Sequence, residues 1–232
     1  MNPVFAALDT TDLARARELA GLLAPHVGGL KLGLEFFLAQ GLANTASVAG
    51  TTPLFLDLKL HDIPNTVAGA VRAIAGLKPE FLTVHAAGGP AMLRAAVAEA
   101  AEAAGRTGHR IKLLGVTVLT SLDDGDLEAV GQRGPAADQV RRLALLARTS
   151  GLDGVICSPF EVAALRAELG PDFQLVVPGI RPAGAALGDQ KRVMGPRDAI
   201  AVGASRLVIG RPITEAPDPA AAARAIAADL GA

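Results

Sequence analysis

Charged residues alternate with leucines in segment 54–62, and this spacing could support acid–base chemistry. As a strand, the segment would place Asp57 and Lys59 on one face and its leucines on the other. Asp62 follows the strand two residues later. An ammonium group between carboxylates stays protonated, because the negative charges favour the cation. Such a lysine could deliver a proton to negative charge that develops on a substrate.

Strand-like runs and Ala-rich helical runs alternate along the whole sequence. We expect strands at Val4–Leu8, Gly29–Leu32, Leu54–Leu60, Phe81–His85, Ile111–Leu119, Gly154–Cys157, Leu175–Val177 and Arg206–Ile209. We expect helices at Asp12–Leu23, Leu34–Gln40, Thr66–Leu77, Pro90–Ala104 (ended by Gly105), Ala136–Thr149, Phe160–Leu169, Pro196–Val202 and Pro219–Leu230.

This alternation predicts an α/β fold with a parallel sheet and right-handed crossovers. The sheet could be an open, doubly wound one or a closed barrel. Eight units in only 232 residues favour a (β/α)8 TIM barrel, whose typical length is about 250 residues. No linker or change in composition divides the chain, so residues 1–232 are predicted to form a single domain.

In such a barrel the carboxyl ends of the strands converge on one site. Besides the residues of segment 54–62, these ends offer Asp9, Lys31, Thr120, Ser121, Ser158, Arg181 and Arg211. Each residue alone has an ordinary structural explanation, such as a helix cap for Asp9 or a surface position for Lys31. The four charges at positions 31, 57, 59 and 62 can instead neutralise one another as a network. Breaking a buried pair would cost about 3–5 kcal/mol.

The loops after the seventh and eighth predicted strands could bind a phosphate group. They contain Arg181, the glycine-rich stretch that leads to Gln190, and the pair Gly210 and Arg211. Glycine lets the backbone approach a ligand closely, and arginine supplies a bidentate positive charge. Phosphate sites are frequent at this position in TIM barrels.

Composition narrows the class of protein. The net charge of −1 offers no field that would attract nucleic acid or an anionic membrane. Cys157 is the only cysteine, and the N-terminal residues do not read as a signal peptide. No apolar stretch reaches membrane-spanning length, and no strand precedes a dinucleotide or Walker-type glycine loop. We therefore expect a cytoplasmic protein.

The motif Asp57-x-Lys59-x-x-Asp62-Ile63-Pro64-x-Thr66 resembles the signature of the orotidine 5′-phosphate decarboxylase family. The resemblance extends over nearly the whole chain. Its further landmarks follow in order: Leu8-Asp9, Lys31-Leu32-Gly33, Thr83-Val84-His85-Ala86, Val118-Leu119-Thr120-Ser121, Pro178-Gly179-Ile180-Arg181, Gln190 and Ile209-Gly210-Arg211. The resemblance implies a TIM barrel that decarboxylates orotidine 5′-phosphate to UMP with neither a metal nor an organic cofactor.

The resemblance also implies roles for individual residues. Lys59 would protonate C6 of the pyrimidine, and Asp9, Lys31 and Asp57 would contact the ribose and hold the charge network. Asp62 and Thr66 would reach into the site of a partner subunit, which makes the unit a homodimer. The remaining contacts would come from Thr120 and Ser121 near the base and from Arg181, Gln190, Gly210 and Arg211 at the phosphate, with Gln190 on a closing loop.

Two alternatives remain at this point. The first is a Mg²⁺-dependent sugar-phosphate decarboxylase or aldolase that shares the Asp-x-Lys-x-x-Asp strand. In that pattern an acidic metal ligand stands where this chain has Lys31, and an ammonium group cannot ligate Mg²⁺. The second is a barrel that binds a phosphorylated ligand without catalysis, because fold alone does not imply function.

Overall fold

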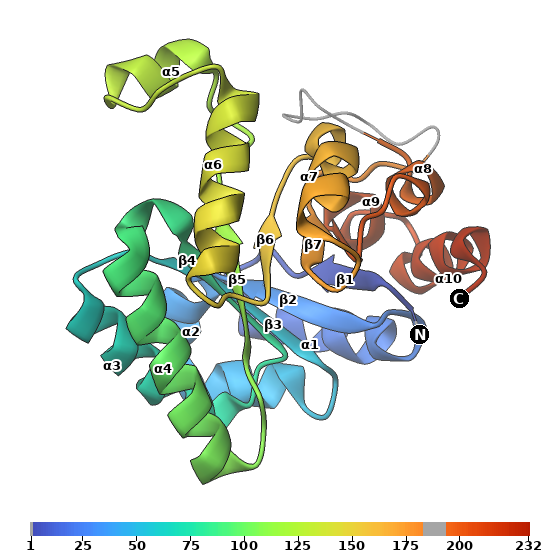
Figure 1. Cartoon of the computed structure of the whole chain (residues 1–232). Helices are drawn as coiled ribbons and strands as arrows, with labels where there is room; N and C mark the ends of the chain where they lie inside the picture. The colour runs from blue at the N-terminus through green and yellow to red at the C-terminus, as the bar shows by residue number, and fades with distance from the viewer. Residues whose placement is uncertain (1, 183–193) are drawn as a thin grey trace.

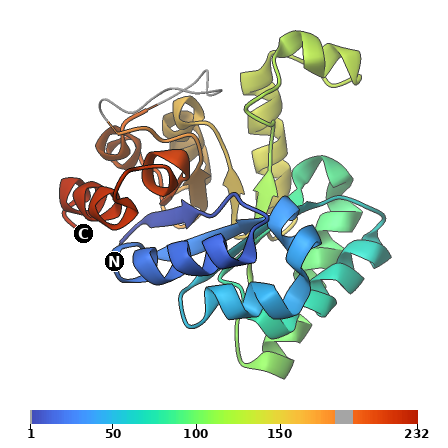
Figure 2. The same cartoon turned by 180° about the vertical axis from the view of Figure 1, so that it is seen from behind.

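The computed structural model describes residues 2–182 and 194–232. Its strands pair in parallel in chain order and close into one barrel, with β8 beside β1. Helices surround the barrel, as the two opposite views in Figures 1 and 2 show. The predicted TIM barrel is confirmed.

The strands are β1 Val4–Ala7, β2 Gly29–Gly33, β3 Leu54–Leu60, β4 Phe81–His85, β5 Lys112–Val116, β6 Gly154–Ile156, β7 Gln174–Val177 and β8 Arg206–Ile209. The α-helices are α1 Leu13–Leu23, α2 Leu34–Ala49, α3 Pro64–Ile74, α4 Gly89–Thr107, α5 Asp124–Ala129, α6 Ala136–Thr149, α7 Val162–Leu169, α8 Pro196–Ala201, α9 Arg211–Thr214 and α10 Pro219–Leu230. Short 3-10 helices lie at Ala24–His26, Ala75–Leu77, Ala86–Gly88 and Pro159–Glu161.

Two predicted helix ends fall well short of the observed ones, and in both cases the predicted end adjoins a glycine. Helix α4 continues past Gly105 to Thr107, and Gly108 ends it in the left-handed conformation with φ of 66°. Helix α2 does not stop at Gln40 but kinks at Gly41, where φ is 69°, and continues to Ala49. A glycine inside a helical pattern therefore marked a helix interior in one case and a kink in the other.

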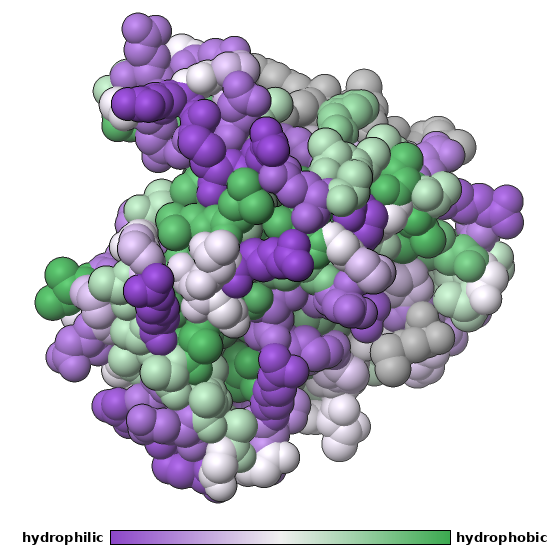
Figure 3. Space-filling view, viewed as in Figure 1, coloured by the Kyte–Doolittle hydropathy of each residue, from purple (hydrophilic) through white to green (hydrophobic). Residues whose placement is uncertain are grey.

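The segment after β5 also differs from the prediction. The strand ends at Val116 rather than Leu119, and the short helix α5 follows it. Asp123 and Asp126 form a capping box that starts α5. In Figure 1, α5 and the upper end of α6 extend away from the barrel. Figure 3 shows a mostly hydrophilic surface over these two helices and apolar residues in the hollow beneath α5.

The amino-terminal half of the barrel interior is an apolar plug. Phe5, Phe55 and Phe81 meet edge to face, with ring centroids 5.4–5.9 Å apart. Each of these rings is at most 1% exposed. Small and branched residues complete the layer: Ala7, Leu114, Val176 and Val208. This plug leaves the carboxyl ends of the strands as the open end of the barrel.

Among the described residues, no helix combines the length and the apolar character that a membrane span requires.

Candidate active site

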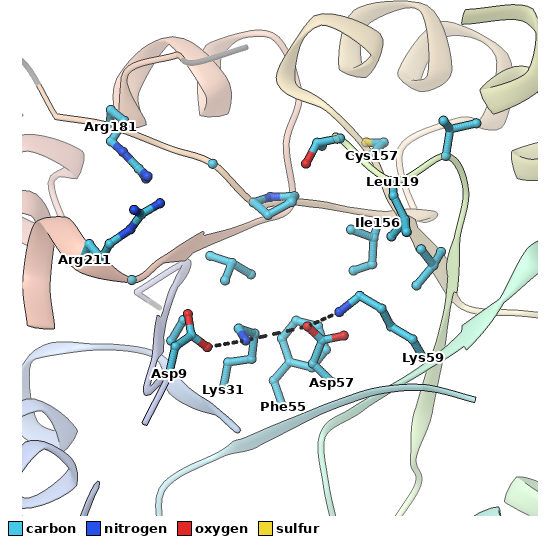
Figure 4. Close-up of a pocket in the computed structure, with 18 residues that line it drawn as sticks. Asp9, Lys31, Phe55, Asp57, Lys59, Leu119, Ile156, Cys157, Arg181 and Arg211 are labelled. Atoms are coloured by element: carbon cyan, nitrogen blue, oxygen red, sulfur yellow. Dashed lines mark hydrogen bonds and ion pairs between the residues drawn. The ribbon is translucent and has the colours of Figure 1, made fainter. Parts of the chain in front are cut away.

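A cavity of about 260 Å³ opens above the apolar plug, at the carboxyl ends of the strands. Phe55, Ile156 and Val208 contribute to its lining, and Figure 4 shows charged side chains on two of its sides. On one side, Asp9 follows β1, Lys31 lies in β2, and Asp57 and Lys59 lie in β3; the charged residues on the other side follow β7 and β8. The cavity therefore brings strand ends from distant parts of the sequence to one place.

Four charges alternate along the first side, as the dashed lines in Figure 4 indicate. Lys31 Nζ lies 3.1 Å from Asp9 Oδ1 and 3.6 Å from Asp57 Oδ2. Lys59 Nζ lies 2.8 Å from the same Asp57 oxygen. The order acid, base, acid, base leaves each charge beside one of opposite sign. The side chain of Lys59 is 36% exposed, so its ammonium group can reach a ligand.

Asp57 is the centre of this network. Burial acts to raise the pKa of its carboxyl group, but the charges of Lys31 and Lys59 oppose that effect. Hydrogen bonds from Lys59 and Thr83 add to the opposition, and the pKa is held below its usual value. Asp57 is therefore a carboxylate near neutral pH and keeps a negative charge against the Lys59 ammonium.

The backbone of β3 is irregular at Lys59. Leu56 pairs with Leu82 of β4, but the next paired residues are Leu60 and Val84. Lys59 has φ of 50°, a left-handed conformation that residues other than glycine rarely adopt. The alternation of faces predicted from the sequence still puts Asp57 and Lys59 at the cavity. The break in the strand pairing was not predicted.

The second charged side carries Arg181 after β7 and Arg211 after β8 (Figure 4). Arg181 is 9% exposed, and its backbone N–H donates to Met194 O. Burial and the neighbouring charge of Arg211 lower the pKa of Arg181. Gly210 also lines the cavity and leaves the backbone there without a side chain, close to Asp9; a Cβ at this position would lie 3.4 Å from Asp9 Oδ2, an ordinary van der Waals contact. Two neighbouring guanidinium groups beside an open backbone suit a dianion such as a phosphate monoester.

The remaining predicted site residues have different positions. Thr120 lines the cavity, whereas Ser121 is exposed and is not part of its lining. Asp62 and Thr66 lie near the start of α3, outside that lining. Gln190 lies outside the described residues.

Within a single chain, Asp9 takes the place that the charge pattern predicted for Asp62 in the network of four charges. Asp62 forms no ion pair with any described residue, and its carboxylate accepts the backbone N–H of Ile63. Asp9 instead pairs with Lys31. The resemblance had already placed Asp9 in the network, whereas the charge pattern alone suggested Asp62, because a single strand pattern does not tell which way the chain turns after its last residue.

Thr83 appears in a landmark of the family resemblance, but sequence reasoning assigned it no role in the site; it is fully buried and touches both Asp57 and Lys59. The alternation of β4 could have indicated this role, because positions 81, 83 and 85 share one face of the strand. His85 at the end of β4 lies against His61, with ring centroids 5.3 Å apart. Burial, followed by the charges of His61 and Lys59, lowers the pKa of His85.

Comparison with known proteins identifies relatives along the whole chain. The model of the orotidine 5′-phosphate decarboxylase / HUMPS family matches residues 2–226. The orotidine 5′-phosphate decarboxylase of Thermobifida fusca is 59% identical over 230 residues, which make up 98% of this chain and 95% of that protein. That of Paramagnetospirillum magneticum is 55% identical over 233 residues, or 100% of this chain and 99% of that protein. The crystal structure of orotidine 5′-phosphate decarboxylase from Lactobacillus acidophilus has a TM-score of 0.86 and 40% identity, and the match covers 100% of both chains.

Proposed function

The chain belongs to the orotidine 5′-phosphate decarboxylase family, and from this premise we propose that Lys59 supplies the proton in its reaction. The reaction is the decarboxylation of orotidine 5′-phosphate to UMP and carbon dioxide in pyrimidine biosynthesis. One observation carries the proposal: Lys59 Nζ lies at the cavity, 2.8 Å from a carboxylate that stays ionised.

In the proposed step, the bond between C6 and the substrate carboxylate breaks, carbon dioxide leaves, and the electron pair remains on C6. The pyrimidine has no electron sink for that pair, so the Lys59 ammonium group stabilises it and then transfers a proton from Nζ to C6. A positive charge acts more strongly in a cavity from which water is excluded than in solution. The neutral amine then regains its proton from solvent.

The other side chains of the first charged side hold the lysine and the substrate. Asp57 and Lys31 fix the position of Lys59, and together with Asp9 they are proposed to bind the ribose hydroxyl groups. Thr120 and Ser121 are proposed to lie near the base. Support for Thr120 comes from its place in the cavity lining.

The second charged side is proposed to bind the 5′-phosphate. Arg181, Gly210 and Arg211 would hold this group, with Gln190 completing the site. The charge of Arg211 contributes to the lowered pKa of Arg181, which supports the assignment because it shows that the two guanidinium groups lie near each other. Binding energy from the phosphate would orient the pyrimidine against Lys59 without taking part in the chemistry.

We also propose that the active unit is a homodimer in which Asp62 and Thr66 enter the partner's site. Both residues lie outside the cavity lining of their own chain. Large apolar side chains are exposed after the neighbouring strands β2 and β3: Leu34, Leu38, Leu42 and Ile63, at 48%, 75%, 44% and 65% exposed. Such exposed side chains suit a protein interface. Cys157, a buried free thiol, accords with a cytoplasmic location.

The direct test follows the ultraviolet absorbance of orotidine 5′-phosphate with purified protein and EDTA. We expect decarboxylation at an undiminished rate. A requirement for Mg²⁺ would favour the metal-dependent sugar-phosphate enzymes, and UMP binding without substrate loss would favour a non-catalytic barrel. The position of Lys31 argues against the first of these, because its ammonium group occupies the space between Asp9 and Asp57.

Subunit exchange tests the contribution of the partner. Lys59→Ala and Asp62→Ala should each be inactive alone, and mixing them should form hybrid dimers with one intact site. Activity should then return to a fraction of the wild-type value. Confirmed exchange without any return of activity would exclude the assignment of Asp62 to the partner's site.

A further inference from the structure

We propose that Thr83 is a positioning residue for this reaction, because its hydroxyl group holds the backbone of Lys59 and the carboxylate of Asp57 together. This inference rests on the proposed role of Lys59 and deepens it. Thr83 lies at the middle of β4 and is 0% exposed. It cannot meet substrate directly and would act through the two residues that it bonds.

The register of β3 and β4 shows why a side chain is needed here. The paired positions are Leu56 with Leu82 and Leu60 with Val84. Three residues of β3, positions 57 to 59, therefore lie opposite Thr83 alone. Such a bulge leaves backbone groups without a ladder partner, and buried N–H groups require another acceptor.

The Thr83 hydroxyl group provides that acceptor. The backbone N–H of Lys59 donates to Thr83 Oγ1 at 2.9 Å, and the hydroxyl donates its own proton to Asp57 Oδ1 at 2.9 Å. The other carboxylate oxygen, Oδ2, accepts a hydrogen bond from Lys59 Nζ at 2.8 Å. The hydrogen bonds thus form a closed path from the backbone of Lys59 back to its ammonium group.

This closed path links the unusual backbone of Lys59 to the position of its side chain. Lys59 has φ of 50°, so its backbone needs support from its surroundings. Among neutral side chains, a hydroxyl group both accepts and donates at a single atom, and only serine and threonine place that atom next to Cβ. Valine has the shape of threonine but makes neither bond.

The charged and titratable groups that face Asp57 are Lys31 from β2, Lys59 from its own strand and His85 from β4. A substitution at Thr83 leaves all three of these residues in the chain. Loss of that hydrogen bond removes a cause that lowers the pKa of Asp57. Since the carboxylate form is the active one, the acid limb of the activity profile should then move to higher pH.

The experiment compares Thr83→Val and Thr83→Ser in the full-length protein. For Thr83→Val we expect kcat for orotidine 5′-phosphate to fall by on the order of 10–100-fold, as small misplacements of catalytic groups do. The dissociation constant for UMP, measured by calorimetry, should change less than about threefold, because Thr83 touches neither the residues proposed to bind the phosphate nor Asp9 and Lys31, and of the residues proposed to bind the ribose it touches Asp57 alone. Thr83→Ser should restore both kcat and the acid limb.

Thr45→Val is the matched control. Thr45 is also 0% exposed, and its hydroxyl donates to Gly41 O within α2, away from the cavity. This variant should lower the melting temperature while kcat and the acid limb stay at wild-type values. Where Thr83→Val does not fold, Thr83→Ala removes the same hydroxyl group with less steric demand and should give the same kinetic result.

Wild-type kcat and an unshifted acid limb in a folded Thr83→Val or Thr83→Ala protein would overturn the inference. So would a failure of Thr83→Ser to restore activity. Lys59→Ala separates the two proposals: if it is inactive while Thr83→Val is normal, only the role of Thr83 fails. If Lys59→Ala is fully active, the proposed function itself fails.

Discussion

The two halves of β3 contrast within a single strand. In the first half, Phe55 and Leu56 pair regularly with both neighbouring strands, and the ring of Phe55 packs edge to face with Phe5 and Phe81. In the second half, the pairing with β4 shifts and Lys59 takes a left-handed backbone conformation. The regular half contributes to the apolar plug inside the barrel, and the irregular half directs charged groups into the cavity.

This difference indicates that the site is built at a cost in stability. A left-handed conformation costs a residue other than glycine roughly 1–2 kcal/mol. The ion pair with Asp57 and the hydrogen bond to Thr83 hold Lys59 in place. Strain of this kind persists where surrounding contacts determine the conformation, and it is frequent at functional sites.

The largest expected effect is on turnover. Lys59→Ala should lower kcat by on the order of 10³-fold or more, because it removes the group that we propose both donates the proton and stabilises the carbanion by its charge. UMP should still bind within several-fold of wild type, since Arg181 and Arg211, the proposed phosphate ligands, remain. Steady-state kinetics and calorimetry measure the two quantities.

Lys112→Ala is a matched control at the opposite end of the barrel. Lys112 begins β5 and pairs with Glu80 at 3.3 Å, outside the cavity lining. Its removal should leave kcat within about twofold of wild type. An equal loss of turnover in both variants would mean that the two ends of the barrel do not differ in function.

A smaller but substantial effect is expected on stability from the apolar plug. Phe5→Ala should lower the free energy of unfolding by about 3–5 kcal/mol, because it leaves a cavity beside Phe55 and Phe81. Phe5 does not line the substrate cavity, so kcat per folded molecule should change far less than in Lys59→Ala. Urea unfolding followed by circular dichroism gives the stability. A loss below about 1 kcal/mol would show that the plug repacks easily.

The smallest predicted effect isolates the backbone at Lys59. Lys59→Gly and Lys59→Ala both remove the amine, so their difference reports the left-handed conformation. The glycine variant should be more stable by about 1 kcal/mol. At Lys112, in a regular strand, the order should reverse, with glycine less stable than alanine by roughly 0.5–1 kcal/mol. The same order at both positions would remove the argument for strain in β3.

The sequence predicted the barrel because each strand and helix has its own periodic pattern. It also located Asp57 and Lys59, since alternation on one strand decides which side chains share a face. It did not predict the shift between β3 and β4, because strand register depends on the neighbouring strand rather than on one segment. The role of Thr83 was not predicted for the same reason, although the residue belongs to a landmark of the family resemblance.

Other differences also arise from tertiary structure. Gly105 has a sequence context typical of a helix end, but the chain turns at Gly108 instead. Asp62 fits the charge pattern of the network, yet its position beyond the end of β3 places it outside the cavity of its own chain. A local pattern gives residue types and spacing, but not the direction of the chain after an element ends.

The most direct test of the central claim is exchange of the C6 hydrogen of a bound product. By microscopic reversibility, the neutral amine of Lys59 should remove this proton and return deuterium in deuterium oxide. With 5-fluoro-UMP, whose fluorine makes C6 more acidic, the wild-type protein should cause the C6–H signal to decay in NMR spectra, and Lys59→Ala should leave it at the rate in buffer alone. Equal exchange by both proteins would contradict the assignment of Lys59 as the proton donor.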